Sequence, residues 1–283
     1  MASVRRPPGA GTDFGEVCMR VLVIGGSGMV GGLVLPYLAE RHDLRVFDLK
    51  PPRPDVDVEY VAGDLRDVAA VSRAVEGVDA VVFMAMGPMA GWGSLDNARA
   101  HFEVAVPGLH VALRAAYEAG VTHAVYTSSM SVYAEPAVDD PGAEDTPRDD
   151  TVSISPGVPG RDRYPDESTP PDATDFYGLA KRLGEEVCRN AAEVYGMSVV
   201  ALRLCHPVAD AEFPRTDHPR ARLICTSARD VARALLAGLD RRGHGFEPFA
   251  ISGDGAERLV PMAKAREVLG WTPLDSTDQP DPA

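Results

Sequence analysis

The sequence predicts an α/β fold, in which a doubly wound parallel sheet is covered by helices on both faces. Short apolar runs rich in β-branched residues alternate along the chain with longer stretches of helical period. The first run, "RVLVIGG", stops at glycines, as a buried parallel strand does before a helix. Alternating β and α units of this kind build a parallel sheet with helices on either side.

Length, composition and charge narrow the class of protein. The chain has 283 residues, 45% of them hydrophobic, which is enough for one large α/β unit with a well-filled core. Its formal net charge of −14 repels phosphate backbones and anionic membrane surfaces, so we expect neither nucleic acid nor membrane as a partner. Residues 1–18 lack the apolar segment of a signal peptide and are expected to be a flexible extension.

The cysteines favour a reducing compartment. Cys18, Cys188, Cys205 and Cys225 form no Cys-x-x-Cys pair and no zinc-like group with histidine. Free thiols are typical of proteins in a reducing cytosol. We therefore expect a cytoplasmic protein without a metal site.

The expected elements follow one another in a regular order. The strands are "RVLVIGG", "LRVFD", "VEYVAGD", "DAVVFMA", "HAVYTSS", "SVVALRL" and "FEPFAIS". Helices begin near Met29, run over 176–195 and 227–240, and end in "VLGW". Between 135 and 175 the chain turns to proline, glycine and acidic residues, which predicts a long loop. This loop is either a solvated insertion or a lid that orders over a ligand.

A glycine-rich turn separates the first strand from the first helix. Gly25, Gly28 and Gly31 are spaced three residues apart. Such glycines let the backbone approach a pyrophosphate closely, and the amides of Met29 and Val30 at the helix N-terminus favour its negative charge. The turn predicts dinucleotide binding in a Rossmann-type fold.

Acidic residues at the ends of the next two strands indicate which dinucleotide binds. Asp48 follows Gly31 by 17 residues, close to the offset at which an acid accepts hydrogen bonds from the adenosine ribose. A carboxylate there repels a 2′-phosphate, so NAD is favoured over NADP, although Lys50 and Arg53 soften that preference. At the end of the third strand, Asp64 and Leu65 are expected to border the adenine.

The pentapeptide "YGLAK" places a tyrosine and a lysine on one face of a helix. Lysine is scarce in this chain, occurring only at Lys50, Lys181 and Lys264, and arginine would serve a solvated helix face equally well. Tyr177 and Lys181 are separated by four residues, so the ammonium can lie near the phenol. A nearby cation favours the phenolate, which is otherwise scarce at neutral pH.

With these pieces in order, the chain resembles the extended short-chain dehydrogenase/reductases, or NAD-dependent epimerase/dehydratase family. The resemblance spans roughly residues 19–274. It is carried by the three glycines, Asp48, "GDLRD", "TSSMSVY", "YGLAK", "ALRLCHP", "ARDVARALLAGL" and "VLGWTP".

The resemblance implies roles for several residues. Tyr177 would exchange a proton with the substrate oxygen, assisted by Lys181, while hydride passes between substrate and NAD. Ser129 would donate a hydrogen bond to the reacting oxygen, with Ser128 as the alternative donor. Met84 and Ala85 replace a histidine-containing stretch and would form an apolar wall beside the nicotinamide.

Other positions depart from the family or concern the substrate. The family asparagine is replaced by Ala105, which removes any water relay built on it. His206 stands where asparagine is common and is a candidate substrate contact or a surface residue. Arg203 would either bind a substrate carboxylate or form a structural ion pair.

The domain organisation follows from these assignments. We expect an NAD-binding domain over 19–203 that includes the acidic loop 135–175. A small substrate-binding region over 204–274 would be interleaved with the sheet, and residues 275–283 would be a flexible tail. This compact C-terminal region is similar to that of uronate dehydrogenases, whereas nucleotide-sugar enzymes commonly devote more chain to the substrate.

Three functions remain open at this stage. The first is an NAD-dependent oxidoreductase that interconverts a secondary alcohol and ketone, or a lactol and lactone, on a sugar, uronic acid or similar polyhydroxylated small molecule. The alternative is a nucleotide-sugar 4-epimerase or dehydratase that retains NAD. The third is a catalytically impaired NAD-binding sensor. The resemblance also implies a homodimer.

Overall fold

The fold was obtained as a computed structural model that describes residues 18–136, 158–215 and 219–278. Nearly all of the expected N-terminal extension, the middle of the 135–175 loop and the end of the tail therefore lie outside the described residues. The main sheet has seven strands in the order β3-β2-β1-β4-β5-β6-β9, and every neighbouring pair is parallel. This arrangement confirms the expected doubly wound fold.

The main-sheet strands correspond to the apolar runs identified in the sequence. They are β1 (Arg20–Ile24), β2 (Asp43–Asp48), β3 (Glu59–Ala62), β4 (Ala80–Phe83), β5 (His123–Ser129), β6 (Ser198–Leu204) and β9 (Phe246–Ile251). The helices are α1 (Met29–Ala39), α2 (Val68–Ala74), α3 (Leu95–Glu103), α4 (Leu109–Glu118), α5 (Phe176–Tyr195), α6 (Pro219–Ile224), α7 (Ala228–Asp240) and α8 (Ala263–Leu269). A π-helical turn, Val104–Gly108, joins α3 to α4, and a 3₁₀ turn, Met130–Val132, follows β5.

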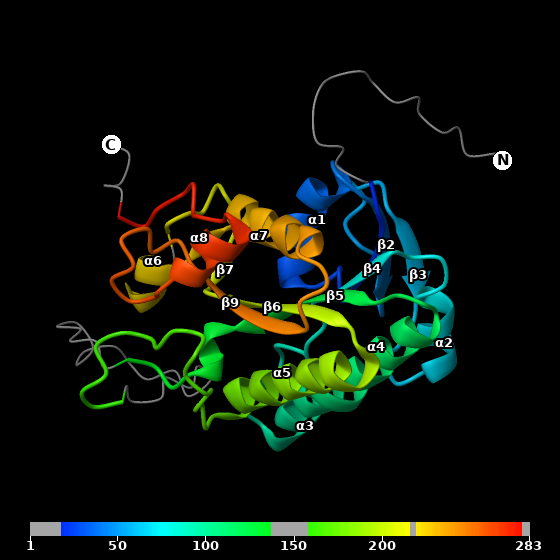
Figure 1. The fold of residues 1–283 in the computed structure, drawn as a ribbon, viewed down its shortest axis with the longest axis horizontal. Helices are drawn as coiled ribbons and strands as arrows, with labels where there is room; N and C mark the ends of the chain where they lie inside the picture. The colour runs from blue at the N-terminus through cyan, green and yellow to red at the C-terminus, as the bar shows by residue number, and fades with distance from the viewer. Residues whose placement is uncertain (1–17, 137–157, 216–218, 279–283) are drawn as a thin grey trace.

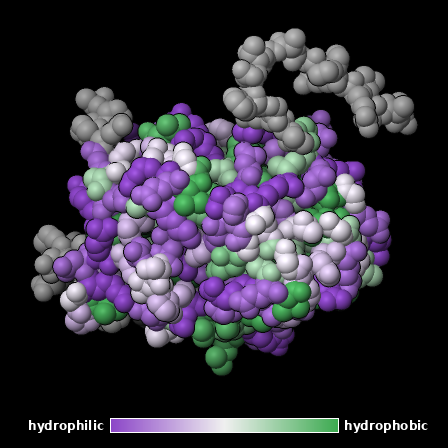
Figure 2. All heavy atoms as spheres, viewed as in Figure 1, coloured by the Kyte–Doolittle hydropathy of each residue, from purple (hydrophilic) through white to green (hydrophobic). Residues whose placement is uncertain are grey.

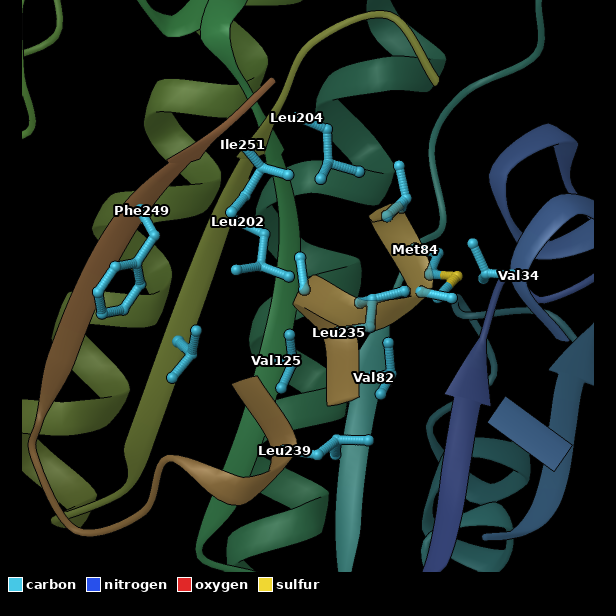
Figure 3. Packing of buried hydrophobic residues seen from close by; sticks show 14 of the residues in the cluster. Val34, Val82, Met84, Val125, Leu202, Leu204, Leu235, Leu239, Phe249 and Ile251 are labelled. Atoms are coloured by element: carbon cyan, nitrogen blue, oxygen red, sulfur yellow. The ribbon is translucent and has the colours of Figure 1, made fainter. Parts of the chain in front are cut away.

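Helices cover both faces of the sheet. Figure 1 shows α1, α7 and α8 on one side of the strands and α3, α4 and α5 on the other. Each face has its own apolar core, because central parallel strands are buried on both sides. In Figure 3, Leu235 and Leu239 of α7 lie over Val82, Val125 and Leu202 of the sheet.

The strand order reverses between β1 and β4, which places a crevice at the carboxyl ends of these strands. Strands β2 and β3 extend the sheet on one side of β1, whereas β5, β6 and β9 extend it beyond β4. Ligands of open α/β sheets bind at such a switch point. The glycine turn after β1 and Ala85 after β4 lie on this edge.

The C-terminal part of the chain returns to the sheet. Strand β9 pairs with β6 at the edge, and α7 packs on α1. After β6, the short strands β7 (Pro207–Val208) and β8 (Thr226–Ser227) pair with each other, and α6 lies between them in the chain. Two-residue strands are too short to show a periodic signal.

The described end of the acidic loop packs against the protein. Tyr164 is buried, and its backbone amide donates to the Leu259 carbonyl at 2.8 Å. The Tyr133 hydroxyl shares its one proton between the carbonyl oxygens of Asp166 and Thr169, at 2.7 and 2.9 Å. These contacts hold residues 158–175 beside the segment that follows β5.

The first residues of the expected tail also make specific contacts. Asp275 accepts hydrogen bonds from the side chains of Ser227 and Arg229, both at 2.7 Å. Its amide donates to the buried carboxylate of Asp230. Residues 275–278 are therefore held on the start of α7.

The outer surface is largely polar. On the face drawn in Figure 2, hydrophilic residues predominate and hydrophobic ones are scattered among them. Among the helices of the described segments, none combines the length and apolar character needed to span a bilayer. The same segments contain no cluster of three or more His, Cys, Asp or Glu side chains arranged to hold a metal ion.

Candidate active site

The glycine turn is shaped by close backbone contacts. Gly25 has φ +79°, in the left-handed region that favours glycine, and a Cβ there would lie 2.5 Å from the backbone of Ala85. A Cβ at Gly31 would collide with the carbonyl oxygen of Gly26. Gly28 precedes α1 in extended conformation and provides no side-chain cap. The amides of Met29 and Val30, in the first turn of α1, therefore remain available to an anion.

Asp48 ties the second strand to this turn. Its Oδ2 accepts a hydrogen bond from the Ser27 amide at 3.0 Å. The Ser27 hydroxyl is buried and has no partner within the described residues, which suits a turn that receives a polar ligand. Arg53 donates to the Gly32 carbonyl at 3.4 Å, so its guanidinium lies over the start of α1, near the expected ribose position. The residues of this region thus fit a dinucleotide.

Asp64 and Leu65 follow β3 beside the crevice. The Arg66 side chain donates to both carboxylate oxygens of Asp64, and these hydrogen bonds lower the pKa of Asp64. Leu65 is half-buried and approaches Gly108. An acid with a lowered pKa and an apolar side chain therefore lie together at the position where the sequence predicted the adenine to bind.

Tyr177 and Lys181 project from the first two turns of α5 into one small pocket. Asp175 caps this helix, since its Oδ1 accepts the amides of Tyr177 and Gly178 at 3.0 and 2.9 Å. The pocket is partly open to solvent, and its volume of about 10 Å³ leaves room for little more than one water molecule. It is lined by Ala85, Met86, His101, Ala105, Tyr126, Tyr177, Ala180 and Lys181.

Lys181 is held by the end of β5. Its Nζ donates to the Thr127 carbonyl at 2.8 Å and lies 5.8 Å from the centre of the Tyr177 ring. Burial lowers the pKa of Lys181 to about 8. At pH 7 the ammonium therefore remains the major form, although less strongly favoured than in water.

The Tyr177 hydroxyl meets the side chain of Ser129. Burial raises the pKa of Tyr177, whereas a hydrogen bond with Ser129 lowers it and the charge of Asp175 raises it. The Ser129 oxygen accepts the Ser131 amide at 3.1 Å, which leaves its own proton to donate. The structure therefore brings Ser129, Tyr177 and Lys181 together.

Ser128 and Arg203 lie in a different network. The Ser128 hydroxyl donates to Glu185 at 2.7 Å, and Arg203 forms a two-bonded ion pair with the same carboxylate, at 2.9 and 2.7 Å. Arg203 also donates to the Tyr133 hydroxyl at 2.6 Å. Both charged side chains are only 1% exposed. Of the two possibilities for Arg203, the structure therefore shows the structural ion pair. Ser128 donates its only hydroxyl proton to Glu185 and not toward Tyr177.

Met84 and His206 also lie apart from the pocket lining. The Met84 side chain is buried in the core between α1 and β4, so the apolar wall consists of Ala85 and Met86. His206 is exposed and has φ +36° just after β6. It contributes no side chain to the pocket around Tyr177.

An aromatic cluster beside Tyr177 escaped the sequence analysis. Trp92 and Phe176 pack against His101, with ring centres 5.2 and 5.4 Å away, and Trp92 lies 5.3 Å from Tyr177. Burial lowers the pKa of His101, which keeps its imidazole neutral. A tryptophan between two glycines, in "AGWGS", was the available signal, since the chain has only two tryptophans.

Comparisons with known proteins agree with this geometry. Residues 21–258 match the model of the NAD dependent epimerase/dehydratase family. L-arabinose 1-dehydrogenase (NAD(P)(+)) from Haloferax volcanii is 29% identical over 272 residues, which cover 91% of this chain and 97% of that protein. Uronate dehydrogenase from Pseudomonas putida is 26% identical over 268 residues, covering 92% and 85%.

A solved structure shares the fold. MoeE5 in complex with UDP-glucuronic acid and NAD superimposes with a TM-score of 0.68 at 19% identity, covering 90% of this chain and 93% of that one. The matched family model spans the glycine turn, Ser129, Tyr177 and Lys181. This protein belongs to the NAD-dependent epimerase/dehydratase family and is an NAD-dependent enzyme of the short-chain dehydrogenase/reductase type.

Proposed function

We propose that the protein is an NAD-dependent dehydrogenase that oxidises a ring alcohol or lactol of a sugar or similar polyhydroxylated small molecule. Two observations carry the proposal: Tyr177 and Lys181 line one pocket with Ala85, which packs against the glycine turn, and Ser129 forms a hydrogen bond with the Tyr177 hydroxyl. Relatives of similar length that act on L-arabinose and on uronates support a small sugar as substrate.

The three polar side chains divide the work of proton transfer. Ser129 donates a hydrogen bond to the substrate oxygen and so orients it toward the phenol. Tyr177 removes the hydroxyl proton of the substrate as the carbon loses hydride, and returns it in the reverse direction. Bound NAD supplies the hydride acceptor and a positive ring that favours the phenolate.

Lys181 stabilises the charge that develops on Tyr177. Its ammonium is fixed by the Thr127 carbonyl, which leaves further N–H donors for the phenol region and a cofactor ribose. In the buried pocket this attraction is stronger than in water. The same burial excludes water from the reacting atoms.

The ion pair of Arg203 changes the order of substrates. Because Arg203 is committed to Glu185, it does not provide the carboxylate-binding group that a uronic acid requires. We therefore place neutral aldoses ahead of uronic acids. The 29% identity to L-arabinose 1-dehydrogenase supports this order.

A panel of aldoses, uronic acids and nucleotide sugars tests the proposal. We expect NADH to accumulate in proportion to an oxidised free sugar. Tyr177→Phe should reduce turnover by roughly 10²- to 10⁴-fold with little change in NAD affinity. Product without net NADH would assign the epimerase or dehydratase function instead, and tight NAD binding without any hydride transfer would assign the sensor.

The assembly and compartment are part of the same proposal. We infer a homodimer through α4 and α5, where Tyr117 and Tyr195 stack with ring centres 5.0 Å apart near the molecular surface. Light scattering that gives the mass of one chain would contradict it. The four cysteines are all free thiols, which supports a cytoplasmic location.

A further inference from the structure

Trp92 is held at the tip of a tight turn between β4 and α3. The Ser94 amide donates to the Gly91 carbonyl at 3.0 Å, so Trp92 and Gly93 are the two central residues of a β-turn. Gly93 has φ +82°, the conformation that the second central residue of a type II turn requires. The backbone therefore fixes where the indole projects.

The base of this turn is anchored on α3. The Asn97 side chain, which is 3% exposed, donates to the carbonyls of Pro88 and Ala90 at 2.5 and 3.1 Å. Gly87 packs flat on the His101 ring, since a Cβ at that position would lie 2.5 Å from its Cδ2. These contacts join the turn to α3 at two points, Asn97 and His101.

The indole lies against the expected catalytic tyrosine. Its ring centre is 5.3 Å from that of Tyr177 and 5.0 Å from that of Phe176. Trp92 is absent from the lining of the pocket that holds Lys181, so it borders Tyr177 on another side. A molecule bound on that side of Tyr177 would therefore lie beside the indole.

The two tryptophans of the chain have different surroundings. Trp271 is 2% exposed, and its Nε1 donates to the Asp230 carbonyl at 3.1 Å, as a core residue should. Trp92 is only half-buried, and within the described part of the chain its indole N–H has no hydrogen-bond partner. A partly exposed aromatic face with a spare donor beside reactive groups is suited to a ligand.

The geometry points to Trp92 as a specificity-determining residue that forms an aromatic wall of the substrate site. The C–H face of a saturated ring packs on the indole, while the indole N–H donates to one of the ring hydroxyls. This assignment rests on the proposed dehydrogenase function and narrows its substrate to cyclic polyols. A pyranose and a carbocyclic polyol share this chemistry, so both are included in the test.

Steady-state kinetics of Trp92→Ala and Trp92→Phe test the wall. We expect Trp92→Ala to raise KM about tenfold, with kcat within about threefold of the wild type and NAD affinity unchanged, because the proton-transfer groups remain. Trp92→Phe should recover most of the affinity. The matched control is Trp271→Phe, which should leave KM unchanged. Equal KM values for Trp92→Ala and the wild type, with a normal control, would overturn the assignment.

Fluorescence provides a second readout that does not need turnover. The difference between wild-type and Trp92→Phe emission isolates the signal of Trp92, because the chain has only two tryptophans. The titration uses the Tyr177→Phe variant with bound NAD, which binds the sugar but does not turn it over. Adding a pyranose or a cyclitol up to saturation should change the Trp92 signal, and the concentration dependence gives the apparent Kd of that ligand. A signal that does not respond to any member of the panel would overturn the wall.

The two failures can be told apart. If the wild type oxidises a sugar but neither Trp92 variant changes its KM, the wall fails and the dehydrogenase function stands. If the wild type oxidises nothing while the Trp92 signal still responds to a cyclic polyol, the wall stands and the proposed reaction fails. Should Trp92→Ala not fold, Trp92→Phe and the fluorescence titration decide the question.

Discussion

Replacing Glu185 by glutamine should destabilise the fold strongly, because this carboxylate balances a buried charge. Glu185 accepts two hydrogen bonds from Arg203 and one from Ser128, all between 2.7 and 2.9 Å. Both charged side chains are 1% exposed. An amide in place of the carboxylate leaves the guanidinium in a water-free site without its counter-charge.

The expected loss follows from the cost of an uncompensated buried ion. Removing one partner of a buried ion pair costs about 3–5 kcal/mol of unfolding free energy. The glutamine oxygen still accepts one hydrogen bond, so we expect the lower end, about 3 kcal/mol. Replacing both partners by methionine should recover about half of this loss, because no charge is then buried, while Ser128 still loses its acceptor.

Urea unfolding followed by circular dichroism measures these free energies. The matched control is Glu103→Gln, which removes an ion pair of 3.0 Å to Arg99 on the exposed face of α3. We expect no measurable change there, because an exposed pair is screened by solvent. A loss for Glu185→Gln as small as that of the control would show that the pair is not desolvated, and the reasoning would fail.

Three further predictions concern the cofactor turn and pH. Asp48→Ala should weaken NAD binding about tenfold, since it removes a charged hydrogen-bond acceptor. It should also reduce discrimination against NADP, because the carboxylate no longer repels the 2′-phosphate. Fluorescence titration of both cofactors measures the two effects. Gly31→Ala should cost about 1–3 kcal/mol of stability and abolish NAD binding, because its methyl group collides with the Gly26 carbonyl; thermal unfolding with and without NAD checks both effects. Burial lowers the pKa of His123 to about 4, against about 6.5 when unfolded, so its contribution to stability is complete above pH 6.5 and is lost as the pH falls toward 4. Between pH 7 and pH 5 the wild type should therefore lose about 2 kcal/mol of unfolding free energy through His123. Urea titrations at the two pH values measure this loss, and a His123→Gln variant should not show it.

The fold could be predicted because its signals are local. Parallel strands buried on both faces are short apolar runs, and seven such runs could be identified in the sequence. The convergence of Tyr177 and Lys181 was legible for a similar reason, since residues four apart on a helix share a face. The glycine turn could be predicted because Gly25, Gly28 and Gly31 allow the backbone to approach a ligand or another segment closely.

The remainder of the site depends on contacts between distant segments. Ser128 and Ser129 both contact α5, through Glu185 and Tyr177 respectively, and the sequence does not say which of the two hydroxyls lies beside the phenol. Arg203 forms its ion pair with Glu185 of α5, a residue that the sequence analysis did not single out. Trp92 lies beside Tyr177 because Asn97 holds the turn that carries it. The two rings are 85 residues apart in the chain, so no local sequence pattern predicts their contact.

One face of α5 carries both the proposed catalytic residues and the acid of the buried ion pair. Tyr177, Lys181 and Glu185 follow at intervals of four residues, so all three point toward the sheet. The first two line the pocket, whereas Glu185 binds the helix to β6 through Arg203. Neither Glu185 nor Arg203 lines the pocket, so their ion pair supports the position of α5 from outside it. The stiffness of the site therefore depends on the same desolvated charges that make the fold sensitive to the loss of Glu185.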